Sequence, residues 1–132
     1  MGVVVGIDGS PSSIAALRRG RAEADRRRCE LLVVHVAAPT EQSHAHGEGL
    51  LREFTGGDRS LLLTGVPGSV LAGHARDADL LVIGTAFAKA PFEGSTVSTV
   101  LHRVPCPLIV CDSGDIAGRM AWNVEFPCAV GV

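Results

Sequence analysis

Five short runs rich in Val, Ile and Leu, separated by stretches with helix signals, constrain the fold of this chain more than any other feature. The runs occupy residues 3–7, 31–36, 60–63, 80–83 and 108–111. The apolar residues in these runs are continuous rather than alternating with polar ones, which is typical of strands buried on both faces of a sheet. Strands that alternate with helices predict an open parallel α/β sheet, doubly wound, with helices on both faces.

Helix signals fill the intervals between these runs. Ser10 followed by Pro11 is a good N-cap with a proline at the first helical position, so a helix is predicted to begin there. Its inward-facing residues are predicted to be Ile14, Leu17 and Ala24. Further helices are predicted near residues 48–54, after Pro67 and over residues 94–104, and the polar segment 39–49 is predicted to be a loop.

The last 20 residues depart from this alternation. Met120, Trp122, Val124 and Phe126 alternate with less apolar residues, and a period of two describes a half-buried strand. We therefore expect an extra, antiparallel edge strand over residues 120–126. The chain is divided into an α/β domain, residues 1–112, and a C-terminal tail, residues 113–132.

Composition excludes several classes of protein. Apolar residues make up 46% of the chain and charged residues 20%, so disorder is excluded. A net charge of −2 does not indicate nucleic-acid binding. No apolar run is long enough to span a membrane, and the first residues lack a signal-peptide pattern, so a cytoplasmic protein is expected. The cysteines show no paired spacing, and Cys106 and Cys111 are expected to pack as small apolar side chains.

One short stretch of the chain is rich in arginine. Six arginines fall within residues 18–28, interleaved with Glu23 and Asp25 and followed by Glu30. This pattern predicts a solvated helix face with ion pairs. The alternative is a patch that binds a phosphate or a partner.

Chemistry is expected at the carboxyl ends of the strands, where ligands bind in open parallel sheets. The first strand leads into Asp8, Gly9 and Ser10, just before a helix. The fourth leads into Gly84, and the chain re-enters a helix at Gly94, Ser95 and Thr96. Backbone N–H groups and hydroxyls at a helix start can face an anion. The alternative is that Asp8, Ser10 and Ser95 only cap their helices.

At these residues the sequence resembles the universal stress protein family. The matching stretches are residues 3–11, 32–36, 77–84, 94–95 and 104–110, which run in the family's order. The resemblance implies the strand order 3-2-1-4-5 and, usually, a homodimer. Because family members commonly pair their last strands, the tail strand is expected to help to build that dimer.

The resemblance also implies a site for ATP with Mg²⁺. Asp8 would contact the ribose end of the ligand, and Val36 would contact the adenine. The family's phosphate signature would bring further residues to the phosphates: Gly84, Lys89, Gly94, Ser95 and Thr96.

The phosphate signature is incomplete in this chain. Phe87 stands at the second glycine, and six residues rather than nine separate it from Gly94. A phenylalanine suits close backbone approach to a phosphate poorly. Two functions stay open: a regulatory or sensing protein with a degraded ATP site, or a nucleotide-free dimeric interaction protein. Neither implies a catalytic residue, and slow ATP hydrolysis would rest on Asp8 beside the metal.

Histidines offer fewer indications. His44 and His46, with Glu48, could bind a metal, but a short polar segment more often leaves such residues in solvent. His35, on the second strand, is predicted to pack or to bond to neighbouring backbone. No metal site is predicted.

Overall fold

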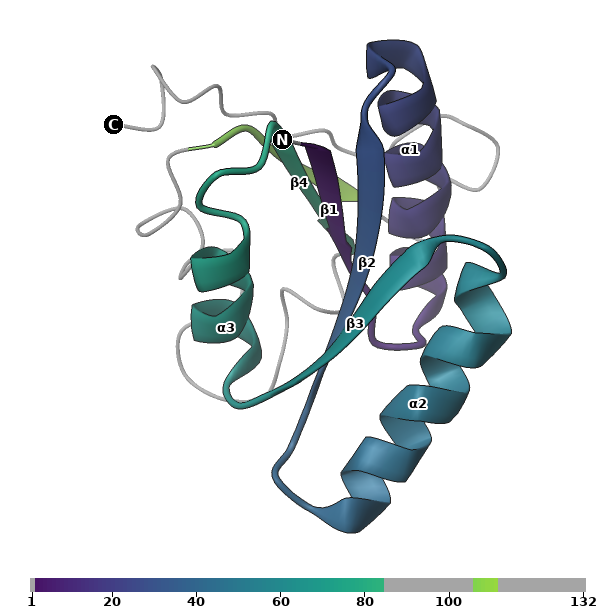
Figure 1. Ribbon diagram of the computed structural model, residues 1–132, viewed down its shortest axis with the longest axis vertical. Coiled ribbons are helices and arrows are strands. Elements are labelled where there is room, and N and C mark those ends of the chain that lie inside the picture. Colours follow the sequence, from purple (N-terminus) through teal and green to yellow (C-terminus); the bar gives the residue numbers. More distant parts are fainter. Residues whose placement is uncertain (1, 85–105, 112–132) are drawn as a thin grey trace.

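The computed structural model describes residues 2–84 and 106–111 of the chain. These residues form a five-stranded parallel sheet of order β3-β2-β1-β4-β5 (Figure 1). The strands are β1 (Gly2–Gly6), β2 (Glu30–Ala37), β3 (Arg59–Thr64), β4 (Leu80–Gly84) and β5 (Leu108–Cys111). Each apolar run is a strand, so the predicted sheet and its order are confirmed.

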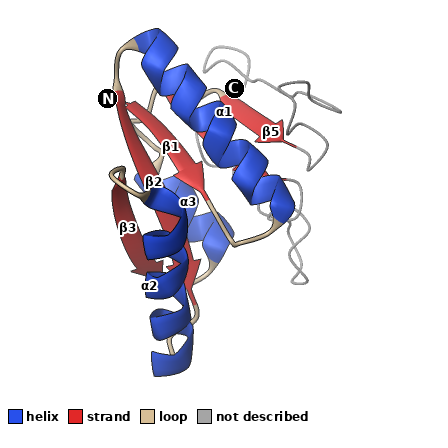
Figure 2. Cartoon of the chain, turned by 90° about the vertical axis from the view of Figure 1, so that its right-hand side faces the viewer, coloured by secondary structure: helices blue, strands red, loops and turns tan. Residues whose placement is uncertain are grey.

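In the part of the chain that the structure describes, three helices cover the sheet. They are α1 (Pro11–Arg27), α2 (Glu41–Thr55) and α3 (Pro67–His74). α1 and α2 lie on one face of the sheet, and α3 lies on the other (Figure 1, Figure 2). Because successive strand residues point to opposite faces, Val33 packs under the first pair of helices and Val34 under α3.

α1 begins at the predicted residue. The Ser10 hydroxyl accepts a hydrogen bond from the Ser13 amide at 3.3 Å, as an N-cap should. Leu17 and Ala24 are buried as predicted, whereas Ile14 is only half-buried. The helix ends at Arg27 and is followed by the C-cap residue Arg28, whose φ of 54° lies in the left-handed region.

The helix predicted near residues 48–54 is present, but it begins earlier, and the prediction of a loop over residues 39–49 is wrong. α2 begins at Glu41 and runs to Thr55. The Thr40 hydroxyl caps it by accepting a hydrogen bond from the Ser43 amide at 3.0 Å, and Glu41 adds an acidic charge to the first turn. Most side chains of the first two turns are exposed, so they carry no apolar pattern. Polarity here marks a solvent-facing helix rather than a loop.

Several predictions fall outside the described residues. They are the last helix, the tail with its edge strand over 120–126, and the phosphate loop after Gly84. None of the helices that the structure describes is long and apolar enough to cross a membrane.

The arginine-rich part of α1 carries the predicted ion pairs, centred on Glu23. Its carboxylate contacts Arg19 at 2.9 Å, Arg26 at 2.5 Å and Arg27 at 3.2 Å, each about one turn away along the same helix. The Glu23 side chain is only 8% exposed. Burial by itself raises the pKa of Glu23, but hydrogen bonds from Arg26, Arg19 and Arg27 outweigh it and lower the pKa from 4.5 to about 2. Glu30 pairs instead with Arg59 on β3.

Replacing Glu23 with glutamine should therefore destabilise the protein in a pH-dependent way. A carboxylate whose pKa is depressed on folding contributes stability above its unfolded pKa, and that contribution is lost as the pH falls toward the folded value. The full shift is equivalent to about 3 kcal/mol, and solvent exposure of the arginines reduces this to about 2 kcal/mol at pH 7.

The difference in unfolding free energy between wild type and Glu23→Gln should shrink between pH 4.5 and pH 2. Urea unfolding at a series of pH values measures it. Asp25→Asn, an exposed acid on the same helix, is the control and should change stability by a few tenths of a kcal/mol at most. A difference between wild type and Glu23→Gln that stays constant from pH 7 to pH 2 would contradict the ion-pair explanation.

Candidate functional site

The carboxyl edge of the sheet contains a point where the order of the strands reverses. From β1 the chain proceeds to β2 and β3 on one side, and β4 and β5 lie on the other side of β1. The strands that follow β1 in sequence lie on one side of it, and the strand that follows β4 lies on the other side. In open parallel sheets, a reversal of this kind leaves a crevice between the carboxyl ends of the two strands, here β1 and β4. Asp8 follows β1, and Gly84 ends β4.

Asp8 is half-buried and shapes the turn that enters α1. Its Oδ1 atom accepts hydrogen bonds from the Ser10 amide at 2.9 Å and from the Ser10 hydroxyl at 2.5 Å. Ser10 in turn caps the helix at Ser13. Asp8 and Ser10 therefore do help to cap α1, as the alternative interpretation predicted. Both hydrogen bonds to Asp8 use the same carboxylate oxygen, Oδ1.

Gly84 lies where β4 meets the first turn of α1. A Cβ atom built on Gly84 would lie 2.5 Å from the carbonyl carbon of Ser12 and 2.7 Å from its carbonyl oxygen. Displacing the Ser12 backbone far enough to accept a Cβ atom would cost considerable free energy, so only glycine fits at this position. This residue, expected to face phosphate, has a packing reason to be glycine whether or not a ligand binds.

His35 ties the end of β2 to the end of β1. Its Nδ1 atom lies 2.8 Å from the carbonyl oxygen of Ile7, and because a carbonyl only accepts, Nδ1 donates. The ring packs against α2, where a Cβ on Gly47 would lie 2.7 Å from the imidazole Cδ2 atom. The predicted role of His35 as a packed, backbone-bonded side chain is confirmed.

Val36, the predicted adenine contact, lies on β2 and is 7% exposed. A hollow of about 390 Å³ adjoins it, between the end of β2 and the first turns of α2. Gln42, Ser43 and His46 of α2 also line the hollow. Gln42 and Ser43 were missed as site candidates, and His46 was considered only as a metal ligand, because their segment was predicted to be a loop. Thr40 followed by Glu41 was the available helix-start signal.

The structure places only part of the predicted site. Asp8, Val36 and Gly84 lie at the carboxyl ends of three neighbouring strands. The other four predicted ligand contacts lie outside the described residues: Lys89, Gly94, Ser95 and Thr96.

The histidines of α2 do not act together. His44 Nε2 lies 2.7 Å from the hydroxyl of Thr64 on β3, whereas His46 lines the hollow beside Val36. Residues two apart on a helix face different directions. Among residues 2–84 and 106–111, no group of three or more His, Cys, Asp or Glu side chains is placed to share a metal ion. Cys106 and Cys111 are buried in the core, as predicted.

Comparisons with known proteins point to one family. Residues 1–54 match the model of the universal stress protein family. A universal stress protein of Mycobacterium tuberculosis is 32% identical over 131 residues, which cover 84% of this chain and 48% of that protein. The chain thus spans about half the length of the curated relatives it matches.

Solved structures agree with this fold. A universal stress protein in complex with cAMP has a TM-score of 0.70 at 23% identity, covering 83% of this chain and 95% of the other. The universal stress protein from Archaeoglobus fulgidus in complex with dAMP has a TM-score of 0.60 at 21% identity, covering 83% and 96%. The strand order, the matched sequence and these relatives agree, and the chain belongs to the universal stress protein family.

Proposed function

We propose that this chain is a regulatory module that binds an adenine nucleotide, ATP with Mg²⁺, in the crevice between the carboxyl ends of β1 and β4. The observation that carries the proposal is the reversal of strand order between these strands, with Asp8 beside it. Ligands of open parallel sheets bind at such points. The two similar structures described above hold cAMP and dAMP, both adenine nucleotides.

Among the described residues, Asp8 and Val36 are the ones that we assign to the nucleoside half of such a site. The half-buried carboxylate of Asp8 can accept hydrogen bonds from ribose hydroxyls, and the backbone at Val36 can pair with the adenine edge. Mg²⁺ is commonly held by one or two carboxylates together with phosphates and water, a set to which Asp8 could contribute. Lys89, Gly94, Ser95 and Thr96 remain the proposed phosphate contacts.

The rival proposal within the family is a nucleotide-free homodimer that acts through partner binding. Phe87 at the second glycine of the signature supports it, because that position otherwise lets backbone approach phosphate. The two proposals differ in one measurable property, which is adenine-nucleotide binding.

Titration calorimetry with ATP and Mg²⁺, on protein checked for co-purified nucleotide, should show binding that depends on Asp8. Asp8→Asn keeps an oxygen for the Ser10 amide but removes the charge, and affinity should fall by about tenfold or more, as expected for a lost charged hydrogen bond. Asp8→Ala should abolish detectable binding and should also cost about 1 kcal/mol of stability through the weakened cap.

The matched control is Asp58→Asn, which removes a carboxylate at the opposite edge of the sheet, where it pairs with Arg21. This variant should bind ATP as wild type does. Equal affinity in wild type and Asp8→Asn would mean that nucleotide binds elsewhere. No heat and no co-purified nucleotide in wild type would favour the nucleotide-free homodimer.

A further inference from the structure

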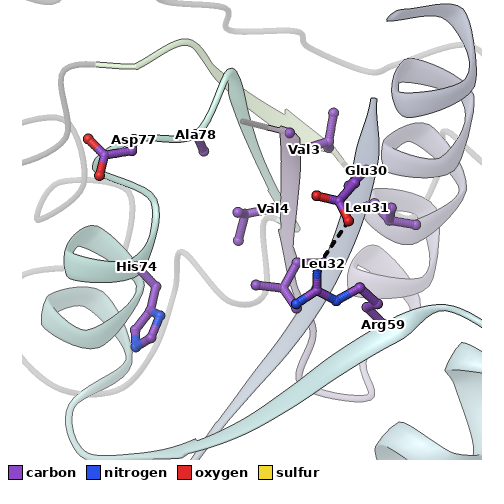
Figure 3. Close-up of a pocket in the computed structure, with 10 residues that line it drawn as sticks. Val3, Val4, Glu30, Leu31, Leu32, Arg59, His74, Asp77 and Ala78 are labelled. Atoms are coloured by element: carbon purple, nitrogen blue, oxygen red, sulfur yellow. Dashed lines mark hydrogen bonds and ion pairs between the residues drawn. The ribbon is translucent and has the colours of Figure 1, made fainter. Parts of the chain in front are cut away.

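A second cavity lies at the amino edge of the sheet, at the opposite end of the strands from Asp8. It has a volume of about 260 Å³ and opens between α3, the turn that follows it, and the starts of β1, β2 and β3 (Figure 3). Nothing in the proposed nucleotide site uses this edge. A concave, mostly apolar space with a few charged groups is the usual form of a small-molecule site.

Strand register explains the floor of the cavity. Val4 pairs with Leu32, and Leu32 pairs with Arg59, so these three side chains form a row on the face that α3 covers. Val4 and Leu32 supply an apolar surface. Gly2 pairs with Glu30 in the next row and has no side chain to fill the space beside it.

An exposed ion pair borders this floor. Arg59 Nη1 donates to Glu30 Oε1 at 3.0 Å, and both side chains are 71% exposed. Figure 3 shows the carboxylate and the guanidinium facing the cavity from β2 and β3, with His74 across from them on α3. The bond between them leaves the second carboxylate oxygen of Glu30 and the Nη2 group of Arg59 unused. Because both side chains are highly exposed, the pair contributes little to stability.

A negative and a positive group side by side complement a ligand that carries an ammonium and a carboxylate side by side. An α-amino acid has this arrangement, with its ammonium able to donate to Glu30 and its carboxylate able to accept from Arg59. Its side chain would then lie on Val4 and Leu32. A simple cation or anion would pair with only one of these two charged side chains. The other carboxylate that lines the cavity, Asp77, is turned away from the floor (Figure 3).

We propose that the amino-edge cavity binds a free α-amino acid with an apolar side chain, oriented by the Glu30–Arg59 pair over the Val4–Leu32 floor. The site is independent of the carboxyl edge, so either site can exist without the other.

Titration of ¹⁵N-labelled protein with L-leucine, followed by amide chemical shifts, tests this. Saturable shifts should appear at Leu31, Leu32 and Ala78, which line the cavity. Isocaproate lacks the ammonium and isoamylamine lacks the carboxylate, and each should bind about tenfold more weakly or worse, as should L-leucine to Glu30→Gln or Arg59→Gln. Because both side chains are exposed, these variants should fold.

Asp58→Asn, which breaks the exposed Arg21–Asp58 ion pair of 2.7 Å, is the matched control and should leave L-leucine binding unchanged, as should Asp8→Asn. Isocaproate or isoamylamine binding as tightly as L-leucine would overturn the proposal. So would unchanged affinity in Arg59→Gln, or the absence of any saturable shift at these amides.

Discussion

Replacing Gly84 with alanine should lower the free energy of unfolding by about 3 kcal/mol, at the upper end of what overpacking usually costs. The new methyl group would meet the backbone of Ser12 at 2.5 Å, where α1 begins. Gly84 is buried, so to make room the first turn of α1 must move away from β4. Urea unfolding in the absence of nucleotide measures the loss.

A second substitution separates backbone from side-chain crowding at this contact. The Ser12 hydroxyl also lies 2.5 Å from the added atom, but removing it with Ser12→Ala leaves the carbonyl group in place. The double variant Ser12→Ala with Gly84→Ala should therefore recover little stability. If Gly84→Ala were as stable as wild type and lost only nucleotide binding, the glycine would serve the ligand rather than the packing.

The second large effect is expected at Gly20, in the middle of α1. A Cβ there would lie 2.2 Å from Cγ2 of Val5, a residue of β1 that is 0% exposed. Alanine favours helix over glycine by up to about 1 kcal/mol, yet the clash should dominate, and Gly20→Ala should cost about 2 kcal/mol net. Thermal or urea unfolding measures the change.

Gly49 provides the matched comparison for Gly20. It also lies inside a helix, but an added Cβ would meet nothing within 4 Å. Gly49→Ala should therefore stabilise the protein by about 0.5–1 kcal/mol. Shortening Val5 to alanine should relieve the clash, so that the double variant costs less than the sum of the two single ones. Equal stability changes in Gly20→Ala and Gly49→Ala would contradict this packing of α1 on β1.

The strands could be predicted because their signal is local. A buried parallel strand must be apolar on both faces, and β1, β4 and β5 show this within a few residues, whereas β3 has no buried residue and was predicted from its run of leucines. The order of the strands came from the resemblance to a family and not from periodicity, since pairing depends on contacts between distant residues. The first half of α2 was missed because it buries little, and an exposed helix leaves no apolar pattern to detect.

The candidate site could also be predicted only in part. Asp8 and Ser10 were identifiable because capping uses neighbours in sequence. The packing reason for a glycine at position 84 could not be predicted, because it depends on how closely β4 approaches Ser12. The amino-edge cavity also escaped prediction. Glu30 was interpreted as a partner of the α1 arginines, whereas the register of β2 and β3 brings it to Arg59.

The position of β1 has a consequence for how the molecule opens. All five of its residues are buried, and it is paired with β2 on one side and with β4 on the other. Its amide protons can reach water only when the middle of the sheet separates, so their exchange reports on opening of the whole domain, while β3 exchanges through smaller fluctuations. The proposed nucleotide and amino-acid sites lie at the two ends of this slowest-opening strand.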